Sequence, residues 1–334
     1  MAKIFGWSAS DEDGCWYYRI KLPLDELRRL GHTTNYGTKM PESWKETADV
    51  IIGQRICNPA PTKMWQSLAA KPNRPKLVFE VDDDLFNIDT TNRHAHYFFG
   101  NPEIQRNLRD NISTADIVTV TTEPLAEVIR GFNPNVFVVN NALPNWLFER
   151  NQFIPSIDKS DERFVAGWAG SMTHSMDFKF AESGLKTFFQ RNPDAVFHTI
   201  GADYGYQIKI SPAQKRYTGW MPGVESLLRF NPFDVGLAPL RPHKFNQSKS
   251  AIKAMEYGAK GIPVLANAAY PYEQYILDGA TGFLVRRDHE WNKILRMLMN
   301  DEAMRIEMGN AGRTLASMNT IRIRSAEWEK ALLS

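Results

Sequence analysis

Short, continuous apolar runs recur along the first 140 residues of the chain, and amphipathic segments separate them. Residues 20–30 carry leucines at helical spacing, and Gly31 follows where a left-handed helix end favours glycine. The runs expected to form strands are residues 3–7, 50–52, 77–81, 117–120 and 136–139. Because these runs do not alternate with polar residues, they predict a parallel sheet covered by helices on both faces.

The same alternation restarts after residues 151–162, a polar stretch with a proline that is a linker candidate. The strands expected beyond it are residues 164–168, 195–200, 234–237 and 262–265. Residues 250–259 give the clearest helix, and residues 322–333 form a second one with Trp328 on its apolar side. The pattern therefore predicts an α/β protein made of two successive doubly wound units.

We expect a first Rossmann-like domain over residues 1–155 and a second over residues 156–315. The remaining residues, 316–334, are expected to be a helical segment that packs back on the first domain. A length of 334 residues agrees with about two domains.

Composition and charge narrow the class of protein. A charged fraction of 23% with 43% hydrophobic residues excludes a disordered chain and a coiled coil. The net charge of +2 divides into −2 for the first 150 residues and +4 for the rest. This mild asymmetry argues against a nucleic-acid binder, but it suits a second half that holds an anionic ligand.

The two cysteines, Cys15 and Cys57, form no CxxC motif and no Cys/His array, so a disulfide scaffold and a structural zinc site are not expected. No apolar run approaches the roughly 18 residues that span a bilayer, and acidic residues follow the N-terminus too closely for a signal peptide. We therefore expect a cytoplasmic protein, for which peripheral membrane contact stays open.

The densest chemical signal lies in residues 246–265. Ser248 is suited to cap a helix, and Lys249, Lys253 and Glu256 would then share one face of it. Lysines near a helix N-terminus attract phosphate, and a glutamate two turns in can accept hydrogen bonds from ribose hydroxyls. The alternative is a surface helix with a solvated charged face.

Three successive acids, Asp82, Asp83 and Asp84, follow the expected strand at residues 77–81. Such a cluster at a strand end can bind a divalent metal, bind or deprotonate a substrate, or form a solvated turn. The residues alone leave these three roles open.

Other candidates carry weaker signals. His94 and His96 lie in the same connection without a spacing that assigns them a role, and Cys15 lacks a histidine partner in a recognisable motif, so a packing role is favoured. Trp220 is either a base-stacking residue or a core tryptophan.

Several motifs together resemble the GT-B glycosyltransferases, in particular the large retaining family called glycosyl transferases group 1 or family 4. The most specific is the run K-S-x-x-K-x-x-E-Y-x-A-x-G-I-P-V at residues 249–264, followed by D-G-x-x-G-F-L-V at residues 278–285. Looser similarities, in chain order, are Gly14 with residues 17–19, residues 30–32, residues 167–171 with His174 and Asp177, residues 217–221 and residues 234–240.

The resemblance implies a GT-B fold, in which two Rossmann-like domains face an interdomain cleft. It implies sugar transfer from a UDP- or GDP-type donor to a hydroxyl acceptor, with retention and without a metal or other cofactor. The acceptor is a glycan, a lipid, a small molecule or a protein. The residues assigned on this basis are Asp82 and Asp83 as catalytic, Gly14 and Asp84 as acceptor-binding, and Gly170, Ser171, His174, Trp220, Ser248, Lys249, Lys253 and Glu256 as donor-binding.

The chain departs from the family pattern at Ser248, where the family has a glutamate that contacts the donor sugar. The usual basic pair for the diphosphate is also displaced, and Lys249, or else Lys244 or Arg241, is the expected substitute. Two alternatives therefore stay open: an epimerase or phosphorylase-like enzyme of the same fold, and a non-catalytic sugar-nucleotide-binding protein.

Overall fold

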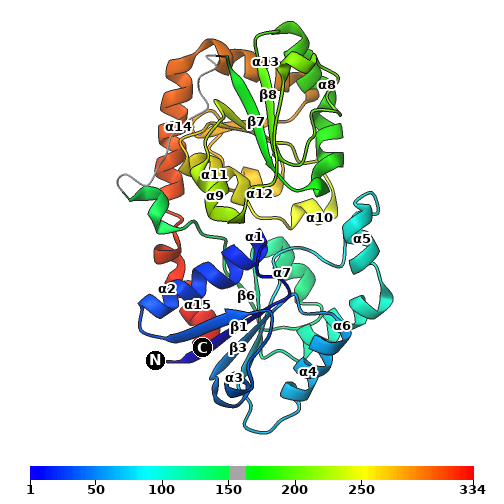
Figure 1. The fold of residues 1–334 in the computed structure, drawn as a ribbon, viewed down its shortest axis with the longest axis vertical. Helices are drawn as coiled ribbons and strands as arrows, with labels where there is room; N and C mark the ends of the chain where they lie inside the picture. Colours follow the sequence, from blue (N-terminus) through cyan, green and yellow to red (C-terminus); the bar gives the residue numbers. More distant parts are fainter. Residues whose placement is uncertain (150–162) are drawn as a thin grey trace. The chain divides into compact units, whose positions relative to one another are not determined.

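The computed structural model describes residues 1–149 and 163–334, which form two compact units (Figure 1). The first unit consists of Met1–Pro144, Ser248–Ser250 and Asn319–Ser334. The second consists of Asn145–Gln247 and Ala251–Met318. The predicted linker at residues 151–162 and the predicted domain boundary at residue 155 lie outside the described residues.

The first unit is built on a parallel sheet with the strand order β2-β1-β3-β4-β5-β6. Its strands are β1 (Lys3–Ser8), β2 (Thr33–Gly37), β3 (Val50–Gln54), β4 (Lys76–Glu80), β5 (Ile117–Val120) and β6 (Val136–Val138). Each of the five predicted strands is confirmed to within two residues at either end. The strand β2 was not predicted, because its residues are mostly polar and it lies at the edge of the sheet.

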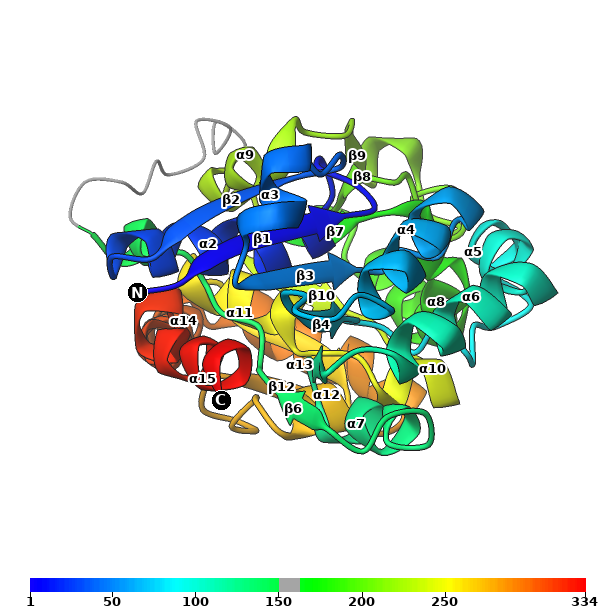
Figure 2. The same ribbon diagram turned by 90° about the horizontal axis from the view of Figure 1, so that it is seen from below.

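Helices cover both faces of this sheet, as Figure 2 shows for α2 and α15 on one side and α4 and α6 on the other. Ile4, Ile52 and Val78 pack toward α2 and α15, whereas their sequence neighbours Phe5 and Phe79 pack on the opposite face. The helices are α1 (Gly14–Trp16), α2 (Leu22–Arg29), α3 (Glu42–Thr47), α4 (Pro59–Ala69), α5 (Arg93–Phe99), α6 (Pro102–Ser113), α7 (Glu123–Ile129) and α15 (Ile321–Leu333). Two-sided burial therefore explains why the strands are continuously apolar.

Two of the predicted helices lie in this unit. The segment expected at residues 20–30 begins earlier, with a π-helical turn η1 (Tyr17–Lys21) that continues into α2. Gly31 has φ +101°, which confirms the left-handed position after the helix. Trp328 on α15 is buried, with Arg19 stacked 4.8 Å from its ring centroid.

The second unit contains another parallel sheet, with the order β12-β11-β10-β7-β8-β9. Its strands are β7 (Val165–Gly170), β8 (Val196–Gly201), β9 (Lys215–Thr218), β10 (Val235–Ala238), β11 (Val264–Asn267) and β12 (Gly282–Val285). Its helical segments are η2 (Asn145–Phe148), η3 (Met172–His174), α8 (Ser175–Arg191), η4 (Pro212–Gln214), α9 (Gly223–Arg229), α10 (Lys244–Gln247), α11 (Ile252–Ala259), α12 (Tyr270–Glu273), α13 (Asp288–Asn300) and α14 (Glu302–Ser317).

This sheet is also buried on both faces. Trp168 and Phe197 pack toward α8 and α13, whereas Val165 and Val196 pack toward α11 with its buried Tyr257. Two doubly wound parallel sheets confirm the predicted α/β fold class. None of the helices in residues 1–149 and 163–334 is long and apolar enough to cross a membrane.

The two strand orders locate the ligand-binding edges. In the second unit the order reverses between β7 and β10, and in the first unit it reverses between β1 and β3. Ligands of doubly wound sheets bind at the carboxyl ends of the strands beside such a reversal. The loops after β7, β10, β1 and β3 are therefore the places to look for function.

Candidate active site

The end of β7 lies close to a lysine of α11. A Cβ added to Gly170 would lie only 3.3 Å from Lys253 Nζ and 2.6 Å from the Trp168 ring. The Lys253 ammonium donates a hydrogen bond to the Ala169 carbonyl and lies 4.9 Å from the Trp168 ring centroid. Gly170 and Lys253 therefore come together at the carboxyl end of β7, as a diphosphate site would require.

The helix α11 begins at Ile252, and no residue that the structure describes caps its N-terminus with a side chain. The prediction that Ser248 caps this helix is wrong. Ser248 is buried, and its carbonyl accepts a hydrogen bond from Thr122 Oγ1 at 2.8 Å, so tertiary contacts hold this segment outside the helix. Lys253 and Glu256 remain on α11, three positions apart and hence on one face.

Lys249 lies before the helix, in the segment Ser248–Ser250 that belongs to the first unit. Its ammonium donates to Asp83 Oδ1 at 3.3 Å. Asn141 Nδ2 donates to Ser250 Oγ at 2.8 Å and fixes the other end of the segment. A residue predicted to bind the donor is thus found beside one predicted to act on the acceptor.

His174 and Asp177 make contacts that hold the segment following β7. His174 Nδ1 lies 2.9 Å from Asp177 Oδ2, and the backbone N–H of His174 donates to Tyr204 Oη at 2.9 Å. The buried Asp177 also accepts hydrogen bonds from the Arg241 backbone and from Asn246 Nδ2, both at 3.0 Å. The loops after β7 and β10 are therefore tied together through this carboxylate.

Trp220 lies at the surface of the second unit, with 66% of its area exposed, so the core alternative is excluded. A Cβ on Gly201, at the end of β8, would lie 2.9 Å from the Trp220 ring. Tyr217 donates its hydroxyl to the Gly201 carbonyl at 3.0 Å. This open aromatic surface beside a glycine is suited to a flat ligand group such as a nucleobase.

In the first unit the three successive acids occupy different environments. Asp84 is fully buried, and its carboxylate accepts hydrogen bonds from the Phe86 backbone and Asn87 Nδ2, which assigns it to a turn rather than to a ligand. The Asp82 side chain is 11% exposed and that of Asp83 is 28% exposed. Only these two acids present oxygens beyond the turn.

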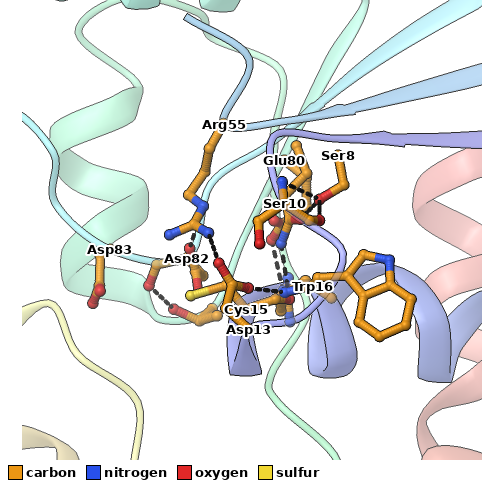
Figure 3. Close-up of polar contacts among 12 residues, drawn as sticks. Ser8, Ser10, Asp13, Cys15, Trp16, Arg55, Glu80, Asp82 and Asp83 are labelled. Atoms are coloured by element: carbon orange, nitrogen blue, oxygen red, sulfur yellow. Dashed lines mark hydrogen bonds and ion pairs between the residues drawn. The ribbon is translucent and has the colours of Figure 1, made fainter. Parts of the chain in front are cut away.

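The structure adds Asp13 and Arg55 to this cluster (Figure 3). Arg55 Nη2 donates to Asp13 Oδ2 at 2.8 Å, and Arg55 Nε lies 3.8 Å from Asp82 Oδ1. Asp13 also caps α1 by accepting from the Trp16 backbone at 2.7 Å. The sequence offered one signal for Arg55, which is its position directly after the buried strand β3.

The residues around this cluster lie in different environments. A Cβ on Gly14 would meet no atom within 4 Å among the described residues, so the start of α1 is open. Burial raises the pKa of the Cys15 thiol well above its ordinary value, which disfavours a nucleophilic thiolate. His94 and His96 lie on the separate helix α5. Residues 1–149 and 163–334 contain no group of three or more His, Cys, Asp or Glu arranged to hold a metal ion.

Comparison with known proteins gives a consistent result. Residues 182–330 match a protein-family model described as glycosyl transferase-like. No curated protein matches the chain.

Solved structures match over nearly the whole chain. The structure of Anabaena HepE with UDP-glucose has a TM-score of 0.69 at 14% identity, covering 99% of this chain and 100% of that one. Sucrose-phosphate synthase from Thermosynechococcus elongatus has a TM-score of 0.65 at 13% identity, with 98% of each chain covered. The match to S. aureus TarM has a TM-score of 0.61 at 12% identity and covers 85% of this chain but 55% of TarM, so the chain spans about half of that protein.

These matches confirm the predicted GT-B fold, and the family match supports the predicted glycosyltransferase class. The matched region includes Lys253 and Glu256.

Proposed function

We propose that this protein is a glycosyltransferase that moves a sugar from a nucleotide-diphosphate donor to a hydroxyl acceptor, with retention and without a metal. The observation that carries the proposal is the contact between Gly170 and Lys253 at the topological switch point of the second sheet. The glycosyl transferase-like match over residues 182–330 supports it. So do structural neighbours that were solved with UDP or UDP-glucose.

In this proposal the second unit binds the donor. Lys253 balances the diphosphate charge, which grows as the glycosidic bond breaks, so its contribution is larger in the transition state than in the ground state. Gly170 and Ser171 allow the phosphates to approach the backbone. Glu256 accepts hydrogen bonds from the ribose hydroxyls, and Trp220 stacks on the base.

The first unit binds the acceptor. The acceptor oxygen forms a bond to the anomeric carbon on the same face from which the β-phosphate oxygen departs, which gives retention. The electron pair of the broken bond leaves with the nucleoside diphosphate. The proton of the hydroxyl moves to the carboxylate of Asp82 or Asp83. Lys249 acts through its ion pair with Asp83 in this scheme, rather than on the donor.

Retention and metal independence rest on the resemblance of residues 249–264 and 278–285 to the retaining family. Proton NMR of the first-formed product tests retention through its anomeric coupling. Turnover that survives treatment with EDTA tests metal independence. An inverted product, or activity that disappears with the chelator and returns with Mg²⁺ or Mn²⁺, would contradict these parts of the proposal.

The central test is sugar transfer by Lys253→Ala and Glu256→Ala, after a panel of UDP- and GDP-sugars has been screened by thermal shift. Loss of one charge-stabilising group typically lowers kcat by about 10²–10³-fold, and we expect Lys253→Ala to fall in that range. The control is Lys293→Ala, an exposed lysine on α13. Near-wild-type turnover by both site variants would refute the proposed donor site.

A second candidate is a protein that binds the sugar nucleotide without transferring the sugar. The observation that favours it is the buried Ser248, which stands where the resembled family has a sugar-binding glutamate. Stabilisation by a nucleotide diphosphate without turnover toward any hydroxyl acceptor would support this candidate.

A further inference from the structure

Arg55 has a backbone conformation that is unusual for its residue type. Its φ angle is +50°, in the left-handed region that non-glycine residues rarely adopt because the side chain crowds the backbone. It directly follows β3, beside the point where the strand order of the first sheet reverses. Its backbone N–H donates to the Glu80 carbonyl at 3.0 Å. The strained conformation persists because the surrounding contacts fix it.

The side chain of Arg55 joins two loops that are far apart in the sequence. It is 15% exposed, and its Nη2 donates to Asp13 in the loop after β1. On its other side, Arg55 Nε lies 3.8 Å from Asp82 Oδ1, beyond hydrogen-bond distance. Both of these atoms are buried and have no hydrogen-bond partner among the described residues. Burial removes Arg55 Nε and Asp82 Oδ1 from water, and the attraction between their opposite charges offsets the free-energy cost of that desolvation.

We infer that Arg55 is a positioning residue, which ties the loop after β1 to the carboxylate of Asp82 and so orients Asp82 toward the acceptor hydroxyl. The guanidinium uses Nη2 toward Asp13 and Nε toward Asp82, so its planar fork reaches both acids at once. Asp13 is fixed in turn by capping α1, which starts at Gly14. The orientation of Asp82 toward an acceptor rests on the proposed function. The link that Arg55 makes between the two loops can be measured whether or not that function is correct.

Cys15 is a natural reporter for this tie. Burial raises the pKa of its thiol, the positive charge of Arg55 lowers that pKa, and the negative charges of Asp82, Asp13 and Asp83 raise it. Removing the guanidinium while the cluster stays closed will raise the thiol pKa further and slow alkylation by iodoacetamide. An opened cluster will instead expose Cys15 and accelerate its alkylation. The only other cysteine, Cys57, lies on a different tryptic peptide.

The experiment compares Arg55→Gln, Arg55→Lys and Arg55→Gly with the wild type. Arg55→Gln is expected to lower kcat at least ~10-fold while the KM for the sugar nucleotide stays within about twofold, because only the acceptor side is disturbed. Arg55→Lys should recover part of the loss, since it keeps the charge but not the fork. Arg55→Gly removes the side chain and also relieves the backbone strain. It should lower kcat as much as Arg55→Gln does, which would show that the side chain, and not the backbone conformation, is responsible.

The matched control is Arg130→Gln, which breaks an exposed arginine–carboxylate pair with Glu123 in the same unit. It should leave kcat and Cys15 alkylation unchanged. Wild-type kcat and an unchanged Cys15 alkylation rate in Arg55→Gln would overturn the inference. If the wild-type protein transfers no sugar, the proposed function fails. A faster Cys15 alkylation in Arg55→Gln still supports the tie between the loops, whereas a slower or unchanged rate shows that the cluster stays closed without Arg55 and refutes it.

Discussion

At the scale of single residues, a buried ion pair involves Glu80, two positions before Asp82 in the sequence. Arg19 Nε donates to Glu80 Oε1 at 2.6 Å, and both side chains are essentially inaccessible to solvent. Arg19 Nη1 also donates to the Val139 carbonyl at 2.6 Å, so the guanidinium connects the ends of β4 and β6. Burial raises the pKa of Glu80 to about 7, although Arg19 and Arg55 oppose the shift.

The raised pKa of Glu80 predicts a pH dependence of stability. Between pH 4.5, its ordinary pKa, and about pH 7, the folded protein binds more protons at this residue than the unfolded chain does. The free energy of unfolding should therefore fall as the pH rises through this window, by at most ~3 kcal/mol. Urea unfolding of the wild type at pH 5 and pH 7.5 measures the fall.

The Glu80→Gln variant tests whether this residue is the cause. It cannot titrate, so the difference in unfolding free energy between the two pH values should shrink relative to the wild type. The exposed Glu123→Gln should leave the difference unchanged. An equal pH dependence in Glu80→Gln and wild type would show that another group is responsible.

The residue scale also shows what the sequence could reveal of the site. Asp82 and Asp83 were identified because they directly follow an apolar strand. That identification needs only their position in the sequence, not the direction of their side chains. The turn role of Asp84 depends on which way its side chain points, which three identical residues in a row cannot reveal. Arg55 was missed because its partner Asp13 lies 42 positions away and its backbone conformation has no sequence signature.

At the scale of helices and strands, the position of α11 depends on glycines. A Cβ on Gly309 of α14 would lie 2.0 Å from the Gly261 carbonyl just past the end of α11, too close for any adjustment short of moving a helix. By contrast, a Cβ on Gly312, one turn later in α14, would make its nearest contact at 3.5 Å. The two glycines therefore form a matched pair of test positions.

We expect Gly309→Ala to destabilise the protein by ~1–3 kcal/mol, because the clash exceeds the gain in helix propensity. Gly312→Ala should be neutral or stabilising by up to ~1 kcal/mol. Urea unfolding compares the two variants. Because α11 carries Lys253 and Glu256, Gly309→Ala should also raise the KM for the sugar nucleotide. Equal stability of the two variants would contradict this account of the packing.

The same scale explains which elements the sequence could predict. Central strands such as β4 and β7 are buried on both faces, so their apolar runs are unambiguous. The strands β2 and β9 lie at sheet edges and are largely polar, so periodicity gave no signal. The start of α11 was predicted too early because Thr122, more than 100 residues away, holds the backbone of Ser248.

At the scale of the whole molecule, each unit has its own sheet and its own core, and each has a different strand order around its switch point. The two halves of the reaction are therefore expected to be separable by mutation. If the second unit alone binds the donor, thermal stabilisation by UDP or GDP depends on Lys253 and not on Asp82. A ligand at 100 times its Kd stabilises the folded state by about 2.7 kcal/mol, which a thermal shift readily detects.

We expect Lys253→Ala to lose most of this nucleotide-dependent shift, and Asp82→Asn to keep it while losing sugar transfer by about 10²-fold or more. Asp82→Asn keeps the size of the side chain but removes its charge and its ability to accept a proton. A loss of activity therefore reports on the charge or the proton transfer, and not on a change of shape. Asp84→Asn is not an equivalent control, because the buried Asp84 holds a turn. Its expected effect is a lower melting temperature with the nucleotide shift preserved. Loss of nucleotide binding in Asp82→Asn would contradict the assignment of donor and acceptor to different units, since the carboxylate would then be acting on the donor.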